Sequence, residues 1–165
     1  MGQLSQFLPY QLSVASNAVS ALISERYRKR FGLKIPEWRV MAVLGDLDAV
    51  ASEEGAREDM MRPGITQRAL TDATLMDKVA VNRACKVLEE RGLIARAPNA
   101  ADGRSHIMVL SEEGRAIHRE VLPLALETER EMFAGFTASE EQRLRAMLER
   151  LRNRVEDLAQ DISAI

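Results

Sequence analysis

The chain has 165 residues, a length that predicts one domain with a sizeable hydrophobic core. Hydrophobic residues make up 46% of it and aromatic residues only 4%, a composition that favours a helix-rich protein. The net charge of −2 excludes a protein that is basic as a whole. The single cysteine excludes an internal disulfide, and no charged leader or apolar run of about 18 residues occurs, so we expect a cytoplasmic protein with no membrane partner.

The first part of the chain predicts two helices. Residues 3–31 form the first, which ends at Gly32 after a mainly basic cluster that suits the negative end of a helix dipole. Pro36 and Glu37 open the second, where the single tryptophan, Trp38, is expected to anchor the core. The apolar residues near one face of the first helix are Leu12, Ala15, Val19, Leu22 and Ile23.

Residues 46–64 (DLDAVASEEGAREDMMRPG) follow the second helix and are rich in alanine and acidic residues. Three interpretations stay open for this segment: it extends the helix, forms an extra turn around residues 57–61, or is mobile. A surface excursion is the ordinary interpretation, and a lid or a partner contact is the alternative.

Two short helices with the same design of N-terminus come next. Thr66 is a suitable cap for the first and Asp77 for the second. Each cap lies between an apolar N′ residue and an apolar N4 residue, which is the spacing of a hydrophobic staple. A short turn at residues 74–76 therefore predicts a helix-turn-helix, and Gly92 suits the left-handed position after the second helix.

The second of these helices has two contrasting faces. The inward stripe, at i, i+3, i+4 and i+7, consists of Val81, Ala84, Cys85 and Leu88. The opposite face carries residue types that can reach base edges and phosphates, namely Lys78, Val79, Asn82, Arg83 and Lys86. By itself such a face is also that of an ordinary solvated helix.

The segment after Gly92 predicts a β-hairpin. Residues 93–96 and 105–110 read as strands around the turn-forming sequence PNAADGR. A hairpin after a helix-turn-helix is a wing, and Arg104 at its tip can enter a narrow, negative minor groove. We expect the Asp102 carboxylate to direct the Arg104 guanidinium through a charge-assisted hydrogen bond.

Two further helices complete the chain. Ser111 caps the first, which contains Pro123 and should be kinked there, and the capping box Thr137-x-x-Glu140 begins the second. The apolar stripe of this last helix consists of Leu144, Met147, Leu148, Leu151, Val155 and Leu158. A winged-helix core of this size has no room for the stripes of all the flanking helices, so we expect them to be buried against a second copy, with an intramolecular bundle as the alternative.

The run TQRAL…MDKVAVNRACKVLEERGLIAR…DGR…LSEEG, together with the upstream PEWRVMAVL, resembles the MarR (multiple antibiotic resistance regulator) family. The resemblance covers roughly residues 9–158. It implies a mainly α fold with a small β wing: a winged helix-turn-helix core flanked by N- and C-terminal dimerisation helices. The chain would be a single MarR-like domain at 1–165, with the winged-helix part at 34–110, an insertion at 46–64 that is longer than in most relatives, and dimerisation helices at 3–31 and 111–160.

The resemblance implies a ligand-responsive regulator of transcription, a repressor, that binds a pseudo-palindromic site in double-stranded DNA as a homodimer. The residues expected to contact DNA are Thr66, Gln67, Arg68, Lys78, Val79, Asn82, Arg83, Lys86, Asp102 and Arg104. From Arg62 to Val109 the chain has eight Lys and Arg against five Asp and Glu, a local positive excess that a dimer doubles. Small aromatic or phenolic effectors are typical of the family, and Trp38 and Arg39 are the candidate effector residues.

Other functions find less support in the sequence. No Gly-rich phosphate loop, nucleophile elbow or acid–base constellation indicates an enzyme, and the two histidines, His106 and His118, are too isolated to predict a metal site. No cofactor is expected. A redox sensor of this family would have a thiol in the first helix, whereas Cys85 lies on the inward stripe. The main alternative is a winged-helix adaptor that binds proteins through residues 46–64.

Overall fold

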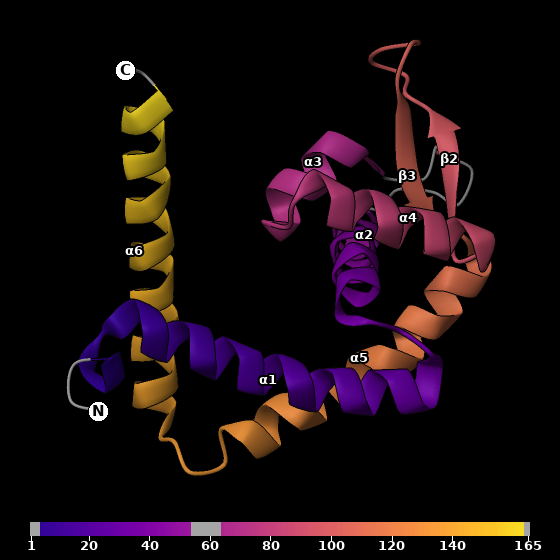
Figure 1. The fold of residues 1–165 in the computed structure, drawn as a ribbon. Helices are drawn as coiled ribbons and strands as arrows, with labels where there is room; N and C mark the ends of the chain where they lie inside the picture. Colours follow the sequence, from indigo (N-terminus) through magenta and orange to yellow (C-terminus); the bar gives the residue numbers. More distant parts are fainter. Residues whose placement is uncertain (1–3, 54–63, 164–165) are drawn as a thin grey trace. The chain divides into compact units, whose positions relative to one another are not determined.

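A computed structural model describes residues 4–53 and 64–163. The elements in chain order are η1 (Leu4–Gln6), α1 (Leu8–Phe31), α2 (Ile35–Glu53), β1 (Ile65–Thr66), α3 (Gln67–Thr74), α4 (Lys78–Glu90), β2 (Ile94–Pro98), β3 (His106–Leu110), α5 (Glu112–Met132) and α6 (Ala138–Ser163). The chain divides into two compact units, residues 1–125 and 126–165, and α5 crosses from the first to the second. The fold is mainly helical with one small sheet, as predicted (Figure 1).

The core of the first unit is formed by α2, α3, α4 and one face of the sheet, together with Tyr27 and Phe31 of α1 and Val121 of α5. Its largest fully buried side chains include Met41, Leu44, Leu70, Leu88 and Met108. The inward stripe of α4 is buried as predicted: each of its four residues is at most 3% exposed. This apolar packing fixes α3 and α4 on α2 and leaves the opposite face of α4 in solvent.

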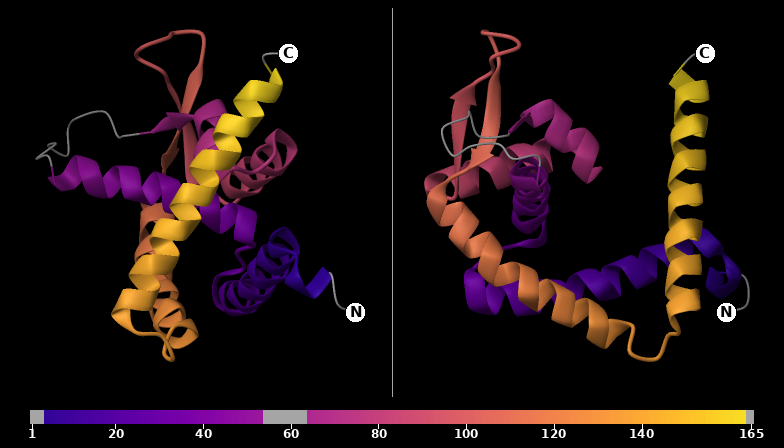
Figure 2. Two further views of the ribbon diagram at one scale, coloured as in Figure 1. Left: turned by 90° about the vertical axis from the view of Figure 1, so that its left-hand side faces the viewer. Right: turned by 180° about the vertical axis from the view of Figure 1, so that it is seen from behind.

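The sheet has three antiparallel strands in the order β1-β3-β2. The hairpin runs from the Ile94↔Leu110 pair to the Pro98↔His106 pair, so β2 extends two residues beyond the predicted strand. Strand β1 was not predicted: Ile65 pairs with Met108 and Thr66 with Ile107. The hairpin projects away from α3 and α4 in Figures 1 and 2, with its turn at the extremity of the first unit.

The predicted caps of α3 and α4 are confirmed. Thr66 Oγ1 accepts the Ala69 N–H at 3.1 Å, and Asp77 Oδ1 accepts the Ala80 N–H at 2.8 Å. Each such cap contributes about 1 kcal/mol of stability. These two contacts set where each short helix begins, and therefore which residues fall on its outer face.

The end of α4 is a Schellman motif centred on Gly92, which has a φ of +69°. The Leu93 N–H donates to the Leu88 carbonyl and the Gly92 N–H to the Glu89 carbonyl, both at 2.9 Å. Gly92 is thus in the left-handed conformation that the sequence predicted. The motif turns the chain directly from α4 into the hairpin.

The start of α5 is held against the beginning of the hairpin. Ser111 Oγ accepts the Gly114 N–H at 2.9 Å, which confirms the predicted cap, and donates to the Gly92 carbonyl at 2.6 Å. Gly114 is buried beside the Leu93 carbonyl, and a Cβ at this position would lie 1.9 Å from that oxygen. Only a residue without a side chain allows α5 to approach the backbone of Leu93, just before β2, this closely.

Gly114→Ala should therefore lower the free energy of unfolding by at least about 1–3 kcal/mol, because the added methyl group meets a backbone oxygen that cannot rotate away. Urea denaturation followed by circular dichroism measures this change. Gly135→Ala is the matched control, since a Cβ there meets nothing within 4 Å. Equal stability of the two variants would contradict the close approach.

The second unit contains the end of α5, a tight turn and α6. Thr137 and Glu140 form the predicted capping box: the Glu140 carboxylate accepts the Thr137 N–H at 2.8 Å, and Thr137 Oγ1 accepts the Glu140 N–H at 3.3 Å. Because of these hydrogen bonds the pKa of Glu140 is lowered. Arg145 and Glu129 form an ion pair at 2.6 Å that joins the two helices. Helix α5 continues through Pro123 without a break.

The segment predicted to depart from the family pattern is only partly described. Residues 46–53 extend α2 to Glu53, in agreement with the first of the three interpretations. The proposed extra turn at 57–61 lies outside the described residues.

Candidate nucleic-acid interface

The exposed face of α4 carries the predicted contact residues. Lys78, Val79, Asn82, Arg83 and Lys86 are all exposed, and the Val79 side chain is 66% exposed despite being apolar. The capped N-terminus places Lys78 and Val79 in the first turn of α4. Hydrogen-bonding amide and guanidinium groups, two ammonium groups and one apolar contact therefore share a single helical face.

Helix α3 adds its N-terminus beside this face. Arg68 is exposed, Thr66 and Gln67 are half-buried, and the Thr66 hydroxyl is engaged as the helix cap. Gln67 Nε2 donates a hydrogen bond to Asn82 Oδ1, which connects α3 with the outer face of α4. Two residues that the sequence placed in one DNA-contacting set are thus brought into direct contact.

The turn between α3 and α4 has a feature that the sequence did not predict. Leu75 has a φ of +51°, and it is the one non-glycine residue of the described part of the chain in the left-handed region. Its side chain is 67% exposed. A β-carbon in this region costs about 1–2 kcal/mol, so the residue that ends α3 is in an unfavourable backbone conformation.

The wing tip is an ordered loop. The Asn99 side chain donates to Ser105 Oγ at 2.8 Å and accepts the Ala101 N–H at 3.1 Å. The Ser105 N–H donates to the Asp102 carbonyl at 3.0 Å. These contacts give the loop a defined path, at the end of which the Arg104 side chain is exposed.

The predicted role of Asp102 needs a correction. We expected its carboxylate to direct the Arg104 guanidinium, but Asp102 Oδ1 accepts the backbone N–H of Arg104 at 3.1 Å. An aspartate side chain that bonds the backbone two residues on forms an Asx-turn, a strong local preference of this residue. Asp102 therefore shapes the loop that presents Arg104 and leaves the guanidinium available.

The wing and α4 are joined by a paired ion contact that sequence reasoning missed. Arg96 on β2 donates to both carboxylate oxygens of Glu89 on α4, at 2.6 and 3.2 Å. A bidentate arginine–carboxylate pair has a defined geometry. It fixes the hairpin relative to the helix whose outer face carries the predicted contact residues.

A second contact joins the end of α4 to the end of α1. The Arg91 guanidinium donates to the Gly32 carbonyl at 3.0 Å and to the Phe31 carbonyl at 2.8 Å. These carbonyls are free acceptors at the negative end of a helix, where a cation is favoured. The arginine thus connects the end of α4 directly with the end of α1.

Trp38 is an anchor between helices. Its ring lies edge-on to Tyr27 of α1, with 5.5 Å between ring centroids, and stacks on His118 of α5 at 5.4 Å. Burial lowers the pKa of His118, an effect that the charges of Asp48 and Asp46 oppose. This packing supports the structural interpretation of the tryptophan.

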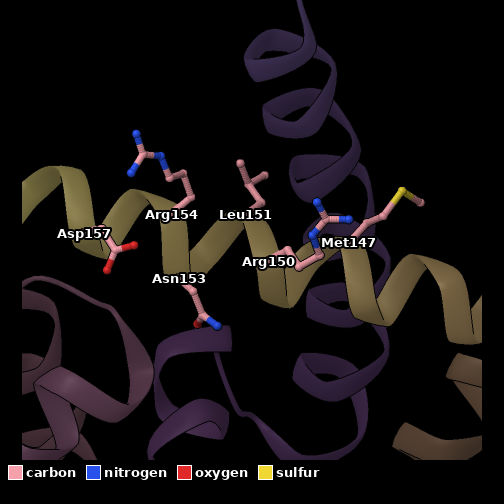
Figure 3. A pocket seen from close by; sticks show the side chains of 6 residues that line it. All are labelled: Met147, Arg150, Leu151, Asn153, Arg154 and Asp157. Carbon is pink, nitrogen blue, oxygen red and sulfur yellow. The ribbon is translucent and has the colours of Figure 1, made fainter.

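Trp38 and Arg39 are not among the residues that line an open pocket on α6. This pocket is lined by Met147, Arg150, Leu151, Asn153, Arg154 and Asp157 (Figure 3). Arg39 is exposed on α2. The assignment of Trp38 and Arg39 to an effector site therefore stays a prediction.

Residues 4–53 and 64–163 contain no group of three His, Cys, Asp or Glu placed to hold a metal ion. In the same residues no helix has the length and apolar character needed to cross a membrane.

Cys85 is fully buried on the inward face of α4, and burial, together with the nearby Glu89 carboxylate, raises the pKa of its thiol to about 11. At pH 8 the native protein should therefore react with a thiol reagent roughly 100-fold more slowly than the unfolded chain, or slower still, because the thiolate is the reacting form. Stopped-flow absorbance with and without denaturant measures both rates. Similar rates in the two states would show that the thiol is accessible.

Known proteins with a similar sequence are regulators of transcription. The sequence profile of the MarR family matches residues 60–105. The transcriptional regulator HosA of Escherichia coli O157:H7 is 35% identical over 89 residues, which are 54% of this chain and 65% of HosA. The HTH-type transcriptional repressor Rv2887 of Mycobacterium tuberculosis H37Rv is 26% identical over 146 residues, 88% of this chain and 91% of Rv2887. The chain thus matches less than two thirds of HosA but nearly all of Rv2887.

The solved structure of a MarR/EmrR family transcriptional regulator from Acinetobacter sp. ADP1 superimposes with a TM-score of 0.76 and 25% sequence identity, covering 94% of this chain and 99% of that one. Profile, relatives and fold together show that this chain is similar to MarR-family transcriptional regulators and shares their winged helix-turn-helix fold.

Proposed function

We propose that this chain is a cytoplasmic DNA-binding regulator of transcription, and a repressor, which acts as a homodimer on a pseudo-palindromic operator. One observation carries the proposal: the solvated face of α4 and the exposed Arg104 of an ordered wing belong to one compact unit, in which Arg96 and Glu89 hold helix and wing together. The names of the relatives, regulators and repressors, support the same function.

In this proposal α4 is the recognition helix and enters a major groove. Asn82 and Arg83 read base edges, Val79 contacts a thymine methyl group, and Lys78 and Lys86 lie toward the phosphates. Thr66, Gln67 and Arg68 at the start of α3 hold the DNA backbone near a helix N-terminus. Arg104 enters the adjacent minor groove, while Asp102 keeps the shape of the loop.

The proposed dimer accounts for apolar residues that are exposed in the single chain. On α6 five apolar side chains of the predicted stripe are 45–55% exposed: Met147, Leu148, Leu151, Val155 and Leu158. On α1, Leu8, Tyr10, Leu12, Val14 and Val19 are 42–74% exposed. A monomer with two helices so exposed would be prone to associate, and a two-fold dimer buries such surfaces in a closed assembly. It would place two recognition helices ~10 bp apart, centre to centre.

We also propose that a small aromatic or phenolic effector regulates the dimer by binding one of its geometries better than the other. The contact of Arg91 with the end of α1 supplies a path, because any shift of the dimerisation helix would move α4. Trp38 and Arg39 stay the candidate effector residues. Thermal-shift screening with aromatic acids, their coenzyme A esters and phenols would reveal the effector class.

The decisive experiment is selection of binding sites from a random DNA library, followed by fluorescence anisotropy over a range of salt concentrations. A regulator should enrich a two-fold symmetric sequence, and its affinity should fall steeply as salt rises. A dimer without DNA affinity at low salt would reject the proposal in favour of a protein-binding adaptor.

A further inference from the structure

The hydrogen bond between Gln67 and Asn82 joins two side chains at the surface proposed to face the operator. Gln67 is the first residue of α3, and Asn82 lies on the exposed face of α4, five positions after the Asp77 cap. The donor is Gln67 Nε2 and the acceptor is Asn82 Oδ1. The contact exists within the free chain, before any DNA is bound.

This bond fixes which end of the Asn82 amide is available. A carboxamide has an oxygen that accepts hydrogen bonds and an NH₂ group that donates two. Because Gln67 occupies one of the two acceptor positions of the oxygen, the NH₂ group is the end of the amide that keeps its full hydrogen-bonding capacity. An exposed asparagine without such a partner can rotate its amide by about 180° to suit the base that it contacts, whereas here Gln67 fixes the orientation of the Asn82 amide before DNA binds.

The usual pairing of asparagine with adenine needs both ends of the amide, since the oxygen accepts from adenine N6 while the NH₂ group donates to N7. In this chain an adenine would have to share the oxygen with Gln67. Guanine offers two acceptors, O6 and N7, and thymine offers O4, so these bases meet the free NH₂ group alone.

We propose, on the basis of the proposed function, that Gln67 is a positioning residue that sets the base specificity of Asn82. Through this hydrogen bond Asn82 presents donors to the DNA and selects guanine or thymine over adenine. Gln67 itself needs no contact with a base for this role. The operator sequence is thereby determined in part by a hydrogen bond between two helices of the protein.

Gln67→Glu tests the proposal with nearly no change of shape. A carboxylate cannot donate, so residue 67 would accept from the Asn82 NH₂ group and turn the amide over. The freed oxygen would then favour bases that present an amino group in the major groove, adenine N6 or cytosine N4. Gln67→Ala would release Asn82 and restore its adaptable pairing with adenine.

The measurement is site selection with the full-length protein, followed by anisotropy on single-base variants of the selected site. Asn82→Ala first identifies the base pair that Asn82 reads, because discrimination is lost at that position. There the wild type should favour guanine or thymine, and Gln67→Glu should change the relative affinities of the bases by about tenfold toward adenine or cytosine. Arg68→Ala is the control: loss of a phosphate contact should weaken binding to all sequences alike.

Two results would overturn the inference while leaving the proposed function intact: selection of adenine by the wild type at this position, or the same base preference in the wild type and Gln67→Glu. A general loss of affinity in Gln67→Glu without a change of preference would show that residue 67 acts only through the charge near the DNA backbone. If the wild type enriches no sequence at all, the proposed function fails, and the assignment of Gln67 with it.

Discussion

Replacement of Arg104 by alanine should weaken binding to the selected operator by roughly 10- to 100-fold, the cost of about 1.5–3 kcal/mol for a lost hydrogen bond to a charged group. The structure gives the physical reason. The side chain is exposed at the end of a loop that its own hydrogen bonds hold in shape, so the guanidinium can enter a narrow minor groove with little loss of backbone entropy.

Fluorescence anisotropy with the operator and with a scrambled duplex measures this effect, and sedimentation velocity should show an unchanged oligomeric state. Arg119→Ala is the matched control, because Arg119 is an exposed arginine on α5, outside the proposed DNA interface. Equal affinity of the wild type and Arg104→Ala would remove the wing from DNA recognition. A smaller oligomer would mean that the wing acts through assembly instead.

The second large effect is expected from Leu151→Glu on α6. Leu151 belongs to the exposed apolar stripe, and in a two-fold dimer each substitution would occur on both sides of the interface. An unpaired buried charge costs about 3–5 kcal/mol, so the dissociation constant of the dimer should rise by at least roughly 10²- to 10⁴-fold. Operator affinity should fall with it, because one half-site alone supplies only part of the contacts.

Asn153→Glu is the control for this experiment. Asn153 lies two residues along the same helix, and in Figure 3 its side chain points away from the side on which Leu151 lies. Both variants carry the same new charge in the same exposed helix, so only position distinguishes them. Sedimentation equilibrium should give a dimer for Asn153→Glu and a monomer for Leu151→Glu at micromolar concentration; two equal dimers would exclude this stripe from the interface.

Several features of the site could be predicted because their signals are local. The caps of α3 and α4 depend on a side chain and a backbone N–H three residues away, and the Gly92 motif depends on six consecutive residues. The buried stripe and the solvated face of α4 follow from the 3.6-residue period in the same way. In each case the interacting groups are separated by less than about two helical turns, so their separation in the sequence determines whether they are close in space.

The prediction for Asp102 shows where local reasoning reaches its limit. The carboxylate had two acceptable partners close in sequence, the guanidinium of Arg104 and the backbone N–H of the same residue. It binds the backbone, because that bond is formed by the turn itself and requires no ordering of a long side chain. The sequence identified the pair correctly but not the atom.

The sequence by itself determined the mainly helical fold, the ends of α4, its exposed face and the hairpin with Arg104. Only the tertiary structure decided how these parts are held: β1 on β3, Arg96 on Glu89, Arg91 on the end of α1, Trp38 between Tyr27 and His118, and Gln67 on Asn82. The physical reason is that a charged, amide or aromatic side chain has many possible partners along the chain, and the packing of the apolar core selects the one that comes within reach.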